Sequence, residues 1–115
     1  MKTHKDLIVW KKSIEFVTEL YQVTSKFSST EIYGVVSQIR RASVSIPANI
    51  AEGAGRNHRK EYKQFIGISL GSASELETLL IISKNLKYIN EEVHKSLSIE
   101  LEGIMRMLIN LQRAL

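Results

Sequence analysis

Cysteine is absent from the 115 residues of this sequence. Neither disulfide bonds nor a thiolate metal site can hold the fold, so its stability has to come from a packed core. The absence also agrees with a reducing compartment. No secretory signal is visible in "MKTHKDLIVWKKS", which holds only a four-residue apolar run, and no window approaches the length of a membrane span. We therefore expect a cytoplasmic protein that makes no contact with a membrane.

The sequence has few residues in the patterns that build catalytic or metal sites. Its three histidines, His4, His58 and His94, are far apart, and no histidine or carboxylate cluster has the spacing of metal ligands. The segment "GAGRN" lacks the Gly-Lys-Ser/Thr ending of a phosphate-binding loop, and no strand precedes it. No nucleophile has a neighbouring base. These absences predict no metal, no cofactor and no enzymatic activity.

Aromatic residues are also few, at 7% of the chain, and Tyr62 stands beside a run of basic residues. The spacing of Tyr62 places it on an apolar stripe as well, which favours a position in the core. If the protein binds nucleic acid, contacts with phosphates should therefore dominate, and readout of the bases should be poor.

What the sequence does contain is apolar residues at steps of three and four, the period of an amphipathic helix. Four helices are predicted: residues 6–26, 30–53 and 57–87, and a last one that Asn90 caps and that extends to Leu115. Gly53 and Gly55 are the expected end and turn residues of the second helix. Long helices with short connections predict an all-α, antiparallel up-down-up-down four-helix bundle that forms one domain over residues 1–115.

The apolar stripes predict which helix faces meet in the core. The first helix offers Leu7, Trp10, Ile14, Val17 and Tyr21. The second offers Ile32, Val35, Ile39, Ala42, Ile46 and Ile50. The third has two adjacent stripes, so we expect it to touch more than one neighbour.

The chain's one proline, Pro47, falls inside the second helix. Proline lacks the backbone N–H and clashes with the carbonyl four residues earlier, so we predict that the helix kinks or restarts here. Ser45 is placed to cap a restarted segment.

A polar stripe runs along the second helix beside its apolar stripe. Its members share one helix face: Gln38, Arg41, Ser45, Asn49 and Glu52. The third helix offers Glu75 at matching spacing, so that Arg41 can pair with Glu52 or with Glu75. The favoured interpretation is a structural hydrogen-bond network that fixes the register of the two helices. The alternative is a ligand or catalytic pocket.

The remaining arc of the second helix is mostly small and apolar. It holds Val44, Pro47, Ala48 and Ala51, next to Arg40. The outward face of a monomer should carry long charged side chains instead. These residues therefore predict a second buried surface, a contact between the subunits of a homo-oligomer.

The net charge of +4 is concentrated in one fifth of the chain. Residues 40–63 hold six basic side chains against two acidic ones, while the rest of the chain has ten of each. The six are Arg40, Arg41, Arg56, Arg59, Lys60 and Lys63. Such a concentration is typical of a surface that binds a polyanion. The alternative is a solvated helix end that only keeps the protein soluble.

Four segments of the chain resemble a known family. They are "DLIVWKKSIEFVTELY", "EIYGVVSQIRRASVSIPANIAEGAGR", "EYKQFIGISLGSASELETLL" and "LKYI", in this order. From Asp6 to about Ile89 they are similar to the bacterial four-helix-bundle family named after proteins encoded in the intervening sequences of 23S ribosomal RNA. The stretch S-I-P-A-N-I-A-E-G is specific, whereas the C-terminal helix matches in pattern only.

The resemblance implies a bundle that assembles as a homo-oligomer, a pentameric ring. It also implies kinship with the accessory variability protein of diversity-generating retroelements, which has a similar fold and a basic surface and binds nucleic acid and a partner reverse transcriptase. Most members of the family have no established biochemical role, and the link to rRNA is the location of the genes.

Three functional hypotheses follow. The leading one is a non-catalytic, oligomeric protein that binds nucleic acid, RNA in particular, with phosphates contacted by Arg40, Arg56, Arg59, Lys60 and Lys63. The second is a protein–protein adaptor whose basic turn docks an acidic partner, such as a reverse transcriptase or a polymerase subunit. The third is an enzyme that uses Arg41, Asn49 and Glu52 in a pocket between subunits.

Overall fold

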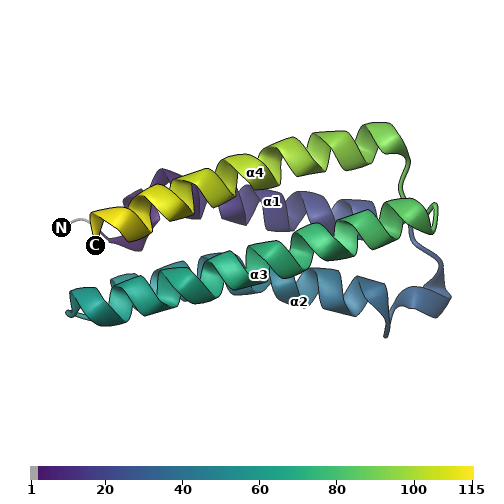
Figure 1. Cartoon of the computed structure of the whole chain (residues 1–115). Helices are drawn as coiled ribbons and strands as arrows, with labels where there is room; N and C mark the ends of the chain where they lie inside the picture. The colour runs from purple at the N-terminus through teal and green to yellow at the C-terminus, as the bar shows by residue number, and fades with distance from the viewer. Residues whose placement is uncertain (1–2) are drawn as a thin grey trace.

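The computed structural model describes residues 3–115, which form an elongated bundle measuring 43 × 24 × 21 Å. Its four helices are α1 (Ile8–Thr24), α2 (Val35–Ala54), α3 (Arg59–Asn85) and α4 (Glu91–Ala114). Two short 3₁₀ turns, η1 (His4–Asp6) and η2 (Ser29–Glu31), precede α1 and α2. Successive helices run in opposite directions, and the described residues contain no strand (Figure 1). The prediction of an all-α four-helix bundle is confirmed.

The helix ends follow from local chemistry. The side chain of Asn90 accepts a hydrogen bond from the Val93 N–H at 2.8 Å, which is the predicted cap of α4. Helix α2 begins five residues later than predicted, because the hydroxyl of Ser28 caps the separate turn η2 instead. Helix α3 stops before Lys87, whose φ of 64° lies in the left-handed region that ends helices.

The core face of α2 is largely the predicted one, whereas that of α1 is so only in part: Leu7 and Trp10 pack against the core, as predicted. Ile39, Ala42, Ile46 and Ile50 are buried, but Ile32 lies outside α2 and is exposed. On α1 the predicted Ile14 and Tyr21 are 40% and 41% exposed. The residues that α1 buries are Val9, Ser13, Phe16, Leu20 and Thr24. A helix with apolar residues on two sides offers two stripes, and the sequence does not say which one faces the core.

The pairing of α2 with α3 is the most extensive in the bundle, and among adjacent helices that of α1 with α4 is the least extensive. Small side chains allow α2 and α3 to approach closely. The buried hydroxyl of Ser69 donates a hydrogen bond to the Ile46 carbonyl of α2 at 2.9 Å. Gly53 does not end α2 as predicted: it lies inside the helix, buried against Phe65 and Tyr62 of α3. Gly55 follows as the C-cap residue.

Helix α2 continues through Pro47 as one α-helix, so the predicted restart is wrong. The predicted cap, Ser45, is engaged elsewhere, because its hydroxyl contacts Asn49 and Ser72. Pro47 itself is buried. Burial of Pro47 and of its neighbours Ile46 and Ile50 therefore holds the helix together across the missing backbone hydrogen bond.

By length and composition, α3 is long and apolar enough to cross a bilayer, with a mean hydropathy of 1.5 over its most apolar 18 residues. The expectation that no window approaches a membrane span is wrong on these two criteria. Core helices of bundles pass the same test, and 33% of this window is buried inside the structure. The finding is therefore weak evidence for a membrane contact.

Candidate functional site

The turn between α2 and α3 carries four of the predicted basic residues. Arg56 is held in place: its guanidinium lies 3.2 Å from the Glu52 carboxylate and 5.2 Å from the centre of the Phe65 ring. The side chains of Arg59, Lys60 and Lys63 are exposed and, within the described residues, form no ion pair. These three cations are thus free to meet a partner from solution.

The first turn of α3 adds backbone donors to the same place. His58 is the N-cap residue, and its side chain makes no capping hydrogen bond. The first N–H groups of a helix have no acceptor within the helix, and the helix dipole favours an anion beside them. Glu61 lies in this turn and reduces the positive potential there.

Folding brings further basic side chains to this end of the bundle. The basic end, as we call it, comprises residues 3–15, 46–72 and 103–115, which are the halves of the four helices nearest both termini and the α2–α3 turn (Figure 1). It holds four acidic residues, Asp6, Glu15, Glu52 and Glu61. Its nine basic residues are Lys5, Lys11, Lys12, Arg56, Arg59, Lys60, Lys63, Arg106 and Arg113.

The opposite half of the described chain has the reverse balance. Residues 16–45 and 73–102 hold six basic and eight acidic side chains. Outside residues 40–63 the chain is neutral as a whole, so this polarity could not be predicted from the order of charges along the chain. It becomes visible once α1 and α4 are known to place their basic ends beside the α2–α3 turn. The missed members are those on α1 and α4, such as Lys11, Lys12 and Arg106.

Arg40 does not belong to the basic end, which corrects the prediction of one patch over residues 40–63. It lies 14 residues before the end of α2, or roughly 20 Å along the helix axis. Its Nε donates to the Thr24 hydroxyl at 3.0 Å, and its guanidinium stacks on the Tyr21 ring at 4.5 Å. These contacts fasten α1 to α2.

The polar stripe of α2 separates into independent contacts rather than one network. Arg41 approaches Glu75 at 3.8 Å, but its side chain is 75% exposed, so this pair contributes little stability. Glu52 pairs with Arg56 and not with Arg41. The exposed Gln38 makes no side-chain hydrogen bond to another described residue.

The middle of the stripe makes most of its hydrogen bonds. The Asn49 amide donates to the carbonyl and to the hydroxyl of Ser45, at 2.8 and 2.9 Å. The Ser72 hydroxyl of α3 donates to the same Ser45 hydroxyl at 2.8 Å. The two helices are thereby joined, and no buried side-chain polar atom in the described residues lacks a partner. A pocket that requires Arg41, Asn49 and Glu52 to converge is not formed within one chain.

We expect Asn49→Ala to lower the free energy of unfolding by about 1 kcal/mol, because it removes two part-buried hydrogen bonds and leaves Ser45 with one partner. Urea denaturation followed by circular dichroism measures the change. A loss above about 3 kcal/mol would show instead that Asn49 holds a larger network than these contacts.

Of the four residues predicted to form the subunit contact on α2, three are at least partly exposed and one is not. Val44 is 42% exposed, Ala48 is exposed and Ala51 is half-buried. Pro47 is buried within the chain, so it presents no side chain to a neighbour. The outer face of α2 therefore comprises Ser37, Arg40, Arg41, Val44, Ala48 and Ala51.

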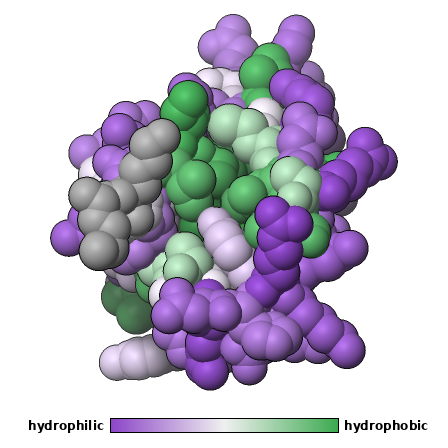
Figure 2. Space-filling view, turned by 90° about the vertical axis from the view of Figure 1, so that its left-hand side faces the viewer, coloured by the Kyte–Doolittle hydropathy of each residue, from purple (hydrophilic) through white to green (hydrophobic). Residues whose placement is uncertain are grey.

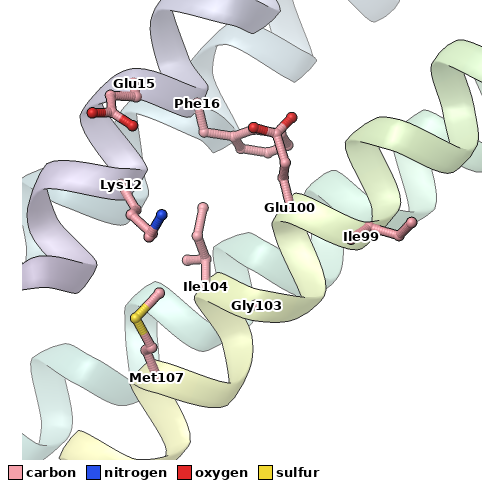
Figure 3. Close-up of a pocket in the computed structure, with 8 residues that line it drawn as sticks. All are labelled: Lys12, Glu15, Phe16, Ile99, Glu100, Gly103, Ile104 and Met107. Atoms are coloured by element: carbon pink, nitrogen blue, oxygen red, sulfur yellow. The ribbon is translucent and has the colours of Figure 1, made fainter.

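A groove between α1 and α4 is the feature that sequence reasoning missed. It encloses about 220 Å³ and is lined from both helices (Figure 3). The lining residues are Lys12, Glu15, Phe16, Ile99, Glu100, Gly103, Ile104 and Met107. Burial, followed by a hydrogen bond and charge repulsion from Glu19, raises the pKa of Glu100 to about 7. No group of side chains in residues 3–115 has the arrangement of a metal site.

Comparisons with known proteins agree with the bundle. A family model described as "23S rRNA-intervening sequence protein" matches residues 5–110. A crystal structure of a protein of unknown function from the S23 ribosomal protein family of Bacteroides thetaiotaomicron VPI-5482 superimposes with a TM-score of 0.85. The two sequences are 26% identical, over 92% of this chain and 96% of that one. No curated protein matches the chain. Neither description names a catalytic activity.

Proposed function

The chain belongs to the 23S rRNA-intervening sequence protein family, and from this premise we propose that it is a non-catalytic, homo-oligomeric protein that binds nucleic acid, RNA in particular, through its basic end. The observation that carries the proposal is the polarity of charge along the bundle. Nine basic side chains against four acidic ones occupy one half, and the other half is acidic. Such a field attracts a polyanion to one end of the molecule.

The side chains at that end suit phosphate contacts. Arg59, Lys60 and Lys63 are exposed and, in the part of the chain described, are free of carboxylate partners. Arg56 is oriented by Glu52 and Phe65, so less conformational entropy is lost when it binds. With few aromatic side chains to stack on bases, phosphate contacts would supply most of the affinity and little sequence preference. An oligomer that presents several such ends would add avidity.

Fluorescence anisotropy of labelled RNA and DNA, titrated at several salt concentrations, tests the proposal. We expect binding whose logarithmic affinity falls linearly with the logarithm of the salt concentration, because neutralised phosphates release counterions. The absence of binding at low salt by an assembled, folded protein would contradict it.

One observation favours a second candidate, an adaptor that docks an acidic protein such as a reverse transcriptase. Apolar side chains gather at the centre of the basic end and are surrounded by hydrophilic ones (Figure 2). Ile8, at the start of α1, is 65% exposed, and Leu115 is half-buried. An apolar centre with a charged rim is the usual anatomy of a protein interface. Salt dependence is expected for both candidates, so a pull-down with a purified reverse transcriptase, in the absence of nucleic acid, separates them.

A further inference from the structure

The groove between α1 and α4 is acidic at its rim and apolar at its floor. Four carboxylates line the groove and its continuation toward the start of α4: those of Glu15, Glu19, Glu92 and Glu100. One ammonium group, that of Lys12, lies among these lining residues. Phe16, Ile104 and Met107 form the floor, and Ile99 at the edge is 58% exposed. Such a surface suits a partner that combines positive charge with apolar side chains.

Two cations lie at the groove, Lys12 in its lining and Arg106 beside Gly103, against the four carboxylates. The pKa of Glu100 is about 7 because of burial, with further increases from Glu19 and Glu15 that Lys12 only partly offsets. An added guanidinium would return the Glu100 carboxylate to its ionised form. The crowding of carboxylates therefore favours the binding of a cation from outside the chain.

The outer face of α2 has the complementary chemistry. The Arg41 side chain is 75% exposed and has one distant acidic partner, Glu75 at 3.8 Å. Next to it, Val44 is 42% exposed and Ala48 has too short a side chain to keep a neighbour away. Tyr33, which lines the same face just before α2, is 97% exposed. An aromatic side chain, a valine and a largely exposed arginine thus lie on the same outer face.

The two surfaces lie at about the same level along the bundle. The hydrogen bond from Arg40 to Thr24 places the start of this α2 face beside the end of α1. Because α1 and α2 are antiparallel, Val44 lies about 6 Å further along, near the level of Glu19. Glu19 of α1 is near enough to Glu100 of α4 to raise the pKa of its carboxyl, which gives α4 the same level. Two copies with parallel axes can therefore bring Arg41 and Val44 to these carboxylates without sliding along each other.

We propose that the outer face of α2 in one copy docks into the groove between α1 and α4 of a second copy, with Arg41 meeting Glu19 and Glu100. This inference rests on the homo-oligomer of the proposed function and names its interface. The two surfaces are different parts of the molecule, so the contact is head-to-tail, and each docked copy still offers one free surface of each kind. Repeated contacts of this type close into a ring when the rotation between copies allows.

Exchanging the two charges tests the contact. Arg41→Glu and Glu100→Lys, each alone, place like charges opposite each other, and we expect either variant to shift the native mass toward the 13.1 kDa of a single chain. The double variant Arg41→Glu/Glu100→Lys restores opposite charges and should regain the wild-type mass. An equimolar mixture of the two single variants should regain assembly in part: neighbours of different variants match in charge, but a ring with an odd number of copies keeps one like-charge contact. Sedimentation equilibrium at equal protein concentrations measures all four samples.

A matched control is Glu77→Lys, the same charge change at an exposed position of α3 outside both surfaces; it should leave the mass unchanged. A monomeric wild type, single variants that remain assembled, or a double variant and mixture that both stay dissociated would each overturn the inference. Failure of the proposed function gives a different result. The protein would then bind no nucleic acid, while the native masses of the variants still change as the exchanged charges predict. Circular dichroism of each variant verifies folding.

Discussion

Reversing two charges at the basic end, with Arg59→Glu and Lys60→Glu together, should lower the affinity for RNA about a hundredfold at low salt. Both side chains are exposed at the first turn of α3, so their reversal removes phosphate contacts and leaves repulsive carboxylates in their place. The slope of log affinity against log salt concentration should become shallower by about 2, one unit for each lost contact. Anisotropy titrations of the same labelled RNA measure both quantities.

The matched control applies the same change of charge at the other end of the bundle. Lys26 and Lys95 are exposed and lie in the acidic half, so Lys26→Glu with Lys95→Glu alters the net charge equally. We expect this control to weaken binding only slightly, through the overall field. Equal losses in the two double variants would show that net charge governs binding, and the basic end would no longer be the site.

Replacing Gly53 with alanine should lower the free energy of unfolding by about 1–3 kcal/mol, although alanine is the better helix former. A Cβ built at Gly53 would lie 2.8 Å from the Cβ of Phe65 and 3.0 Å from Cδ1 of Tyr62. The Cβ of Phe65 is fixed to the α3 backbone and cannot rotate away. The substitution must therefore push the end of α2 away from the start of α3, and with it the turn that carries Arg56 and Arg59.

Gly71 supplies the control for this effect. It also lies inside a helix, but a Cβ built there would meet nothing within 4 Å. Gly71→Ala should raise the free energy of unfolding by up to about 1 kcal/mol, the helix-propensity difference alone. Urea denaturation of both variants gives the comparison. If Gly53→Ala were as stabilising as Gly71→Ala, the close approach of α2 and α3 would not be rigid.

The number, order and direction of the helices could be predicted from the sequence, because each helix carries its own periodic apolar stripe and short polar segments separate the stripes. Asn90 shows this most simply: an N-cap residue followed by two glutamates needs no tertiary information to begin a helix. The predicted core of α1 was wrong at Ile14 and Tyr21 for the opposite reason. Ile14 and Phe16 are both apolar, and only the position of α2 and α4 decides which of them is buried.

The candidate site was harder to predict, because charge contacts depend on distances across helices. Arg40 is near the basic run in the sequence, yet it stacks on Tyr21 of α1, roughly 20 Å along α2 from the α2–α3 turn. Arg106 is distant in the sequence, yet it belongs to the basic end. The groove with Glu19 and Glu100 has no local signal at all, since it exists only where α1 and α4 lie side by side.

The first and last described residues both emerge at the basic end (Figure 1). A fluorescent protein, an affinity tag or a surface linker joined to either terminus would therefore stand beside the α2–α3 turn and compete with a large ligand for space. Attachment through the opposite end, for instance at an exposed position of the turn between α3 and α4, would leave that side open. The affinity measured for chains immobilised by a terminus should consequently be lower than the affinity of the same protein free in solution. The difference should shrink as the linker is lengthened.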